Sequence, residues 1–159
     1  MNNNFDLYSE NVMKYFRNPK NIGKIDNPDS VSTVGNPKCG DVMKVYLKIG
    51  QRPVLKVSSK KLTVNNKKSK KTSDSRKLKT EKYIKDIKVQ TLGCGAAIAT
   101  SSAATQMVKG LSLKEALGIT NQKIVEKLGG LPKVKYHCSL LAEQGIKKAI
   151  QKYLDSDNN

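Results

Sequence analysis

The sequence predicts an α+β fold, a small antiparallel β-sheet with helices packed on one face. Two segments, 42–49 and 84–91, alternate apolar and polar residues as half-buried strands do. After Cys94 the apolar residues recur at helical spacing almost to the end of the chain. Strands followed by a run of helices are typical of an α+β domain, and 159 residues suffice for a single domain with its own core.

The N-terminal part is predicted to form a helix and then a short strand. Over residues 6–17 the apolar side chains fall on one side at helical spacing, and Asn18-Pro19 then ends the helix. The next segment is rich in Gly, Pro, Asn and Asp and holds a β-branched run at 31–34, so we expect a loop, a short strand and a second loop. In the strand at 42–49, one face consists of Met43, Val45, Leu47 and Ile49, which we assign to the core.

Four helices are predicted after Cys94. Residues 96–110 are dense in Ala and Ser, which suits close packing against a sheet. The helix over 112–118 begins with a capping box formed by Ser112 and Glu115. A third helix is closed by Gly129, and a last amphipathic helix begins at Cys138.

A Lys-rich insertion at about 51–82 separates the two long strands. It holds +10 of the net charge of +17. Its centre, about 65–80, has too little apolar surface to offset the entropy lost on ordering, so we predict disorder there. The insertion lacks interleaved aromatic residues and any recognised nucleic-acid-binding module, which favours a solvated loop over a nucleic-acid arm.

The composition argues against membrane, imported and disulfide-bonded classes of protein. The apolar runs are too short to span a bilayer. Asp6 and Glu10 are not expected in an Arg-rich, acid-poor transit peptide, so we predict a cytoplasmic protein rather than one of a mitochondrial-type matrix. Three cysteines are an odd number, and in a reducing compartment cysteines serve more often as metal ligands or reactive thiols than as bridges.

Each cysteine lies at a predicted structural boundary. Cys39 precedes a strand, Cys94 lies between a strand and a helix, and Cys138 opens the last helix directly after the only histidine, His137. Helix N-termini favour the thiolate over the thiol. Three thiolates with either His137 or Asp41 make four ligands, which suit a tetrahedral zinc ion or a [2Fe–2S] cluster. Because the spacing lacks CxxC pairs, incidental buried thiols and a cysteine–histidine hydrolase site stay open as alternatives.

Three stretches closely resemble the IscU/NifU-type iron–sulfur cluster assembly scaffold proteins. They are VGNPKCGDVMKVYLKI (34–49), VQTLGCGAAIATSSAATQMVKGLSLKEAL (89–117) and LPKVKYHCSLLAEQGIKKAI (131–150). The opening YSENVMKYFRNPKNIG (8–23) is similar to the first helix of that family. The resemblance covers almost the whole chain outside the insertion.

The resemblance implies a scaffold and carrier rather than an enzyme. Such a protein assembles a [2Fe–2S] cluster from iron and persulfide sulfur and transfers it to apo acceptor proteins. The positions that match the family's ligands are Cys39, Asp41, Cys94, His137 and Cys138, with zinc as an occupant of the cluster-free form. Cys138 is the best match for the persulfide acceptor and Cys94 is the second candidate. The implied partners are a cysteine desulfurase, a ferredoxin and a frataxin-like protein.

Two departures bear on this resemblance. Lys133 stands where the family's Leu-Pro-Pro-Val-Lys segment has its second proline, which argues against docking of an Hsp70-type chaperone. The alternative function is that of a zinc-binding sulfur acceptor similar to SufU, a sulfurtransferase. SufU has its insertion between the second and third cysteines and generally lacks the histidine, whereas this chain has its insertion between the first two cysteines and retains His137.

The residue types also suggest how a cluster would be released. A carboxylate is a harder and weaker ligand than a thiolate, so we hypothesise that Asp41 makes one cluster position labile. The glycines beside Cys39 and Cys94 either let the loops open for exchange or are ordinary turn residues.

Overall fold

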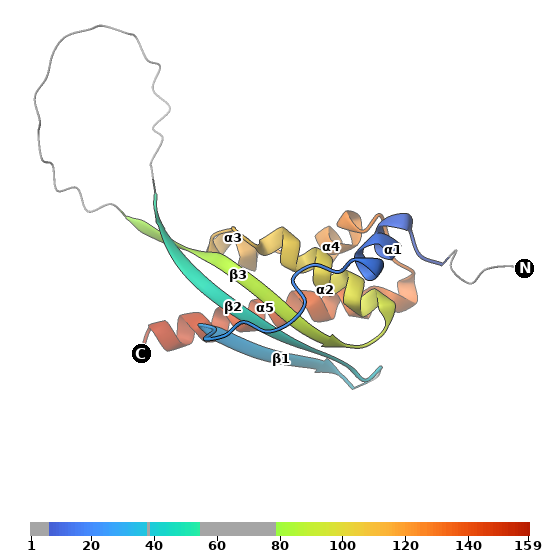
Figure 1. The fold of residues 1–159 in the computed structure, drawn as a ribbon, viewed down its shortest axis with the longest axis horizontal. Coiled ribbons are helices and arrows are strands. Elements are labelled where there is room, and N and C mark those ends of the chain that lie inside the picture. The colour runs from blue at the N-terminus through green and yellow to red at the C-terminus, as the bar shows by residue number, and fades with distance from the viewer. Residues whose placement is uncertain (1–6, 38, 55–78) are drawn as a thin grey trace, which may run out of the picture.

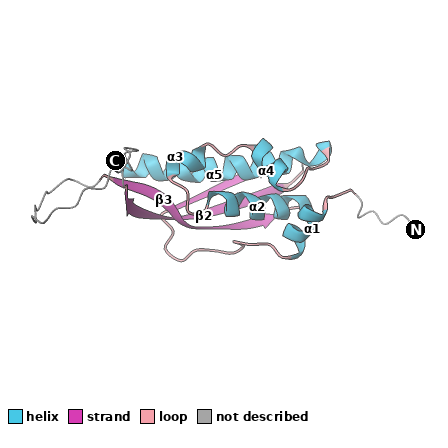
Figure 2. Ribbon diagram, turned by 90° about the horizontal axis from the view of Figure 1, so that it is seen from above, coloured by secondary structure: helices cyan, strands magenta, loops and turns pink. Residues whose placement is uncertain are grey.

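The computed structural model describes residues 7–37, 39–54 and 79–159. Its elements are α1 (Glu10–Arg17), β1 (Ser30–Asn36), β2 (Asp41–Pro53), β3 (Thr80–Leu92), α2 (Gly95–Val108), α3 (Leu113–Leu117), α4 (Asn121–Lys127), the 3₁₀ turn η1 (Lys133–Lys135) and α5 (Tyr136–Asp157). The strands form an antiparallel sheet in the order β1-β2-β3. α5 packs on β1 and β2 while α2 packs on β3, and both helices lie on the same face of the sheet (Figures 1 and 2). The predicted α+β fold is confirmed.

The core lies between the sheet and these two helices. The predicted inward face of β2 is confirmed at Met43, Val45 and Leu47, which are all buried, whereas Ile49 is half-buried at the edge of the core. α5 comes close to the sheet at Gly145, where a Cβ atom would lie 3.1 Å from Cγ2 of Val45. The missing side chain therefore lets the helix backbone approach the strands.

Small residues allow α2 to be buried on nearly all sides. The helix contacts α1, α5 and β3, and its alanines and hydroxyl residues are almost all buried. Thr100 and Ser101 both donate to the carbonyl of Ala97 within the helix, whereas the Ser102 hydroxyl accepts a hydrogen bond from the Lys20 amide outside it. This packing fixes the start of α2, and with it Cys94, against the rest of the fold.

The strands β2 and β3 are longer than the sequence predicts. Gln51–Pro53 pair with Thr80–Lys82, so both ends of the predicted insertion belong to the ladder rather than to a disordered segment. The pairing is supported by a salt bridge of 3.0 Å between Arg52 and Glu81 and by the Arg52 guanidinium over the Tyr83 ring. The remaining residues of the insertion, 55–78, which include most of the segment predicted to be disordered (about 65–80), lie outside the described residues.

The helix boundaries agree with the sequence in the middle of the chain but differ at the first and last helices. α1 begins at Glu10, with Ser9 as its N-cap, rather than at about residue 6. Ser112 and Glu115 form the predicted capping box at the start of α3. α5 begins at Tyr136, two residues before the predicted start at Cys138, so His137 lies inside the first turn rather than ahead of the helix. Within the described ranges, no helix combines the length and apolar character needed to cross a membrane.

Candidate functional site

Three segments that are distant in sequence meet at one end of the sheet. Cys39 lies in the turn between β1 and β2, and Asp41 is the first residue of β2. The register pairs Val42 with Leu92, so the start of β2 lies beside the end of β3, where Cys94 caps the N-terminus of α2. The first turn of α5 reaches the same end of the sheet (Figure 1). Antiparallel pairing and helix packing thus bring the three cysteines to one region.

The five residues singled out by the sequence form two overlapping groups. The potential ligand atoms of Cys39, Asp41 and His137 lie within 4.8 Å of one another, and so do those of Asp41, Cys94 and Cys138. Asp41 belongs to both groups. No sequence-predicted site residue is left apart from this cluster.

The Asp41 carboxylate is the centre of the arrangement. Its Oδ2 atom lies 3.7 Å from Sγ of Cys138 and 3.8 Å from Nε2 of His137. The sulfur atoms of Cys94 and Cys138 lie 3.8 Å apart. Asp41 is only 5% exposed, so this charged group is held inside the fold beside donors that could share a metal ion with it.

The three cysteines form a gradient of burial. Cys39 is exposed, Cys94 is half-buried and Cys138 is buried. Burial raises the pKa of the Cys138 thiol far above its usual value, and the neighbouring Cys94 and Asp41 act in the same direction. This corrects the expectation that a helix N-terminus favours the thiolate at Cys138, since desolvation outweighs the helix dipole there.

A cation lies beside Cys94. The pKa of the Lys135 ammonium is raised, first by its electrostatic interaction with Cys94 and then by that with Tyr8. Cys94 also occupies the N-cap position of α2, where its side chain makes no capping hydrogen bond. Positive charge therefore lies beside the half-exposed thiol, and sequence analysis missed the Lys135 contribution because the two residues lie on different elements.

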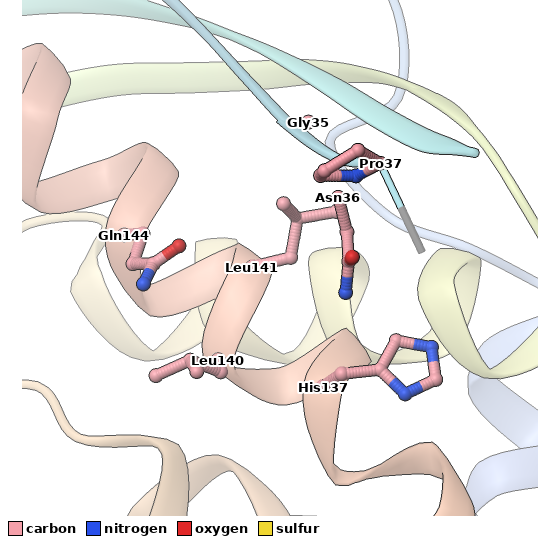
Figure 3. Close-up of a pocket in the computed structure, with 7 residues that line it drawn as sticks. All are labelled: Gly35, Asn36, Pro37, His137, Leu140, Leu141 and Gln144. Atoms are coloured by element: carbon pink, nitrogen blue, oxygen red, sulfur yellow. The ribbon is translucent and has the colours of Figure 1, made fainter. Parts of the chain in front are cut away.

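A pocket of about 230 Å³ opens beside His137 (Figure 3). Its lining residues are Gly35, Asn36, Pro37, His137, Leu140, Leu141 and Gln144. In Figure 3 the imidazole and the Asn36 side chain lie at one end, and Gln144 and Leu140 of α5 lie at the other. Among the described residues that line it, none carries a carboxylate or an ammonium group, and Pro37, Leu140 and Leu141 make this approach to His137 partly apolar.

The donor set combines soft thiol ligands with the harder ligands imidazole and carboxylate. Two thiols, Cys94 and Cys138, lie together on the inner side, while the imidazole of His137 and the exposed Cys39 lie on the other side of Asp41. Thiolates and imidazole suit zinc, iron and iron–sulfur clusters, whereas carboxylates bind such centres more weakly. The arrangement can hold a thiophilic metal and still offer one weakly held position.

These features define a class of small α+β proteins in which cysteine, histidine and aspartate converge at one end of a three-stranded sheet. The family model described as the NifU-like N-terminal domain matches residues 7–63 and 72–159. The chain belongs to this family. The resemblance stated from the sequence is thereby confirmed.

Several characterised relatives are similar over nearly the full chain. The iron–sulfur cluster assembly scaffold protein IscU 1 of Archaeoglobus fulgidus is 45% identical over 92% of this chain and 76% of its own length. The IscU scaffold protein of Escherichia coli strain K12 is 41% identical over 92% of this chain and 93% of its own. The iron sulfur cluster assembly protein 1 of Encephalitozoon cuniculi is 37% identical over 94% of this chain and 88% of its own length.

Solved structures share the fold at lower identity. A putative iron–sulfur cluster assembly scaffold protein for the SUF system from Fervidobacterium islandicum matches with a TM-score of 0.59 and 20% identity, covering 93% of this chain and 99% of that one. The N-terminal part of a NifU-like protein from Brucella abortus matches with a TM-score of 0.58 and 18% identity, covering 94% and 96%. At these identities the likeness supports the fold alone.

Proposed function

We propose that this chain is a scaffold on which a [2Fe–2S] cluster is assembled and from which it passes to apo acceptor proteins. The observation that carries the proposal is the pair of overlapping donor groups that share Asp41. A two-iron cluster needs ligands on both irons, and these groups offer donors on two sides of one carboxylate. Membership of the NifU-like family and relatives named as IscU scaffolds support the same function.

The two irons would be held unequally. Cys94 and Cys138 are the ligands of the inner iron, and Cys39 with His137 or Asp41 completes the outer one. Because the carboxylate is the weakest of these ligands for such a cluster, the outer iron is the one released first. The exposure of Cys39 also lets an acceptor thiolate approach that side.

Sulfur would arrive as a persulfide carried by a cysteine desulfurase. The acceptor thiolate attacks the outer, sulfane sulfur, a new S–S bond forms on the scaffold, and the desulfurase cysteine leaves as thiolate with the electron pair of the broken bond. Cys138 is the proposed acceptor, and because burial raises the pKa of its thiol, it must lose its proton before it can attack. Cys94 is the second candidate, because it is half-exposed and its sulfur lies 3.8 Å from that of Cys138, close enough to pass the sulfane sulfur inward.

The remaining reactants come from other proteins. Release of sulfide from a persulfide consumes two electrons, for which a ferredoxin is the proposed donor, and a frataxin-like protein is the proposed source of iron. The predicted cytoplasmic location, and the weak fit to an Hsp70-type chaperone at Lys133, stay predictions from the sequence.

Anaerobic reconstitution tests the proposal. The chain is incubated with Fe²⁺, L-cysteine and a cysteine desulfurase, then desalted and assayed for iron, acid-labile sulfide and visible absorption. We expect equal iron and sulfide with sulfur-to-iron charge-transfer bands, and loss of both on changing Cys39, Cys94 or Cys138 to alanine. A protein that retains no sulfide would contradict the scaffold function.

A zinc-binding sulfur acceptor is the second candidate. The observation that favours it is that the same donors, drawn from thiols, imidazole and carboxylate within 4.8 Å, also suit a tetrahedral zinc ion. This candidate predicts tightly held zinc that iron does not displace and a persulfide that forms without visible absorption. The reconstitution assay with zinc analysis separates the two functions.

A further inference from the structure

Gly93, the residue before Cys94, packs directly against the Asp41 side chain. A Cβ atom at Gly93 would lie 2.8 Å from Oδ1 and 2.9 Å from Cγ of Asp41, and 3.0 Å from Cβ of Ala97. Optimal contacts between carbon atoms are about 3.5–4.0 Å. The carboxylate therefore occupies the space that any side chain at position 93 would need.

Backbone conformation does not explain the glycine at this position. The glycines with a left-handed backbone are Gly23, Gly40, Gly110, Gly129 and Gly130. Gly93 is not among them, so alanine could adopt its backbone conformation without strain. Glycine is required at position 93 because a side chain there would not fit beside Asp41.

The position of this carboxylate decides the geometry of both donor groups. Its Oδ1 atom faces Gly93, whereas its Oδ2 atom lies between Cys138 and His137, at 3.7 and 3.8 Å. A group that pushes on Oδ1 and Cγ would therefore displace Oδ2 from its place between the thiol and the imidazole. The short aspartate side chain has little room to absorb the shift, because it is 5% exposed.

We propose that Gly93 is a positioning residue for Asp41, whose lack of a side chain lets one carboxylate serve both metal-binding groups. The proposal deepens the scaffold function proposed above and rests on it for its biological meaning. Gly93 has no side chain to touch metal or sulfur, so the proposed effect is indirect and passes through Asp41.

The two glycines beside Cys94 provide a matched pair of variants. Gly93→Ala adds a methyl group that meets Asp41, whereas Gly95→Ala adds one on the other side of Cys94, where the nearest atom is in the Phe16 ring at 3.3 Å. Phe16 is 40% exposed and can yield. Both variants add one methyl group directly beside Cys94, but only Gly93→Ala reaches the carboxylate.

Cobalt(II) binding to the metal-free protein under anaerobic conditions is the readout, because visible Co²⁺ bands report ligand type and geometry. We expect Gly93→Ala to weaken Co²⁺ binding about tenfold, as changes in groups that orient ligands do, and to alter the visible bands as Asp41→Ala does. Gly95→Ala is expected to keep the wild-type spectrum and affinity. An unchanged spectrum and affinity in Gly93→Ala would overturn the proposal.

The double variant Gly93→Ala/Asp41→Ala separates positioning from general loosening of the loop. If Gly93 acts through the carboxylate, the double variant binds Co²⁺ no more weakly than Asp41→Ala alone. A further loss of affinity in the double variant overturns the proposal, because the methyl group then acts on something other than Asp41.

Folding is checked by circular dichroism, and an unfolded Gly93→Ala still gives an answer. Removing the carboxylate makes room for the methyl group, so the double variant should then regain the fold. A double variant that also fails to fold overturns the proposal, since the clash then lies with Ala97. Cobalt binding that depends on Gly93 in a protein that assembles no cluster would defeat the scaffold function and leave the positioning role intact.

Discussion

The sulfur atoms of Cys94 and Cys138 lie 3.8 Å apart, although one caps α2 and the other lies in the first turn of α5. Two thiols at this distance can bind one metal ion without rearrangement of the backbone around them. The inner part of the site is thus preformed by the packing of α2 and α5, and the variable part is the side of Asp41 that faces Cys39 and His137. The predictions below follow from this division.

Replacing Asp41 with alanine is expected to slow cluster transfer to an acceptor about tenfold, a factor of the size found when groups around a metal are altered. Without its weakest ligand, the cluster is held by thiolates and imidazole alone and leaves less readily. The measurement is the rate of cluster appearance on an apo-ferredoxin, followed by circular dichroism. Asp86→Ala is the control, because Asp86 pairs with Lys109 away from the site. Equal transfer rates for wild type and Asp41→Ala would contradict the labile-ligand hypothesis.

The metal-free protein is expected to lose stability in alkaline solution. Burial raises the pKa of the Cys138 thiol in the folded state above its ordinary value of 9.0. Above that ordinary value the unfolded chain loses this proton while the folded chain keeps it, so the free energy of unfolding falls by up to about 1.4 kcal/mol per pH unit. Below it both states are protonated and the stabilising effect is fully present.

Urea unfolding between about pH 8 and pH 10, with chelator and reductant, measures this dependence. Cys138→Ala removes the thiol, so its stability should fall less steeply with pH over the same range. The comparison uses the slopes and not the absolute values, because the cavity left by the smaller side chain lowers stability at every pH. Equal slopes for wild type and Cys138→Ala would show that burial does not keep the Cys138 thiol protonated in the folded state.

Enlarging Gly145 is expected to destabilise the fold. A Cβ atom there already lies 3.1–3.2 Å from methyl groups of Val45 and Val34, so Gly145→Val overpacks the interface between α5 and the sheet and costs about 2–3 kcal/mol. The measurement is the urea midpoint at constant m-value. Gln151→Val on the exposed side of the same helix is the control, with an expected loss below about 1 kcal/mol from helix propensity and its hydrogen bond to Asp155.

The segment 55–78 is expected to be dispensable for cluster assembly. The amide of Val54 donates to the carbonyl of Lys79 at 2.9 Å, so an Asn-Gly turn can join these residues directly. We expect the shortened chain to retain its thermal unfolding midpoint and its iron and sulfide content after reconstitution. Loss of assembly in a folded deletion variant would show that the segment takes part in the reaction.

Local patterns predicted the fold well where a single face or cap decides the structure. The inward face of β2 and the capping box at Ser112 follow from residue type and spacing alone, and both are present. The extra length of β2 and β3 could not be predicted in this way, because it depends on cross-strand partners such as Arg52 and Glu81, which are far apart in sequence.

The site shows the same division. The positions of the three cysteines at predicted structural boundaries, and of His137 next to Cys138, predicted the site residues that the structure brings together. The burial of Cys138 depends on how α5 lies against α2, which no local pattern records, so the effect of desolvation on its pKa was not foreseen. The contact between Gly93 and Asp41 joins the turn after β3 to the start of β2, and in the sequence Gly93 reads only as a turn glycine.

The hydrogen bond between Val54 and Lys79 lies at the tip of the β2–β3 hairpin, at the opposite end of the sheet from the start of α2 (Figure 1). A fluorophore, affinity tag or surface anchor placed between these two residues, instead of segment 55–78, would be remote from the thiols. The molecule could therefore be immobilised by this tip on a sensor, with its cysteine-bearing end facing the solution, and loaded and unloaded repeatedly in flow.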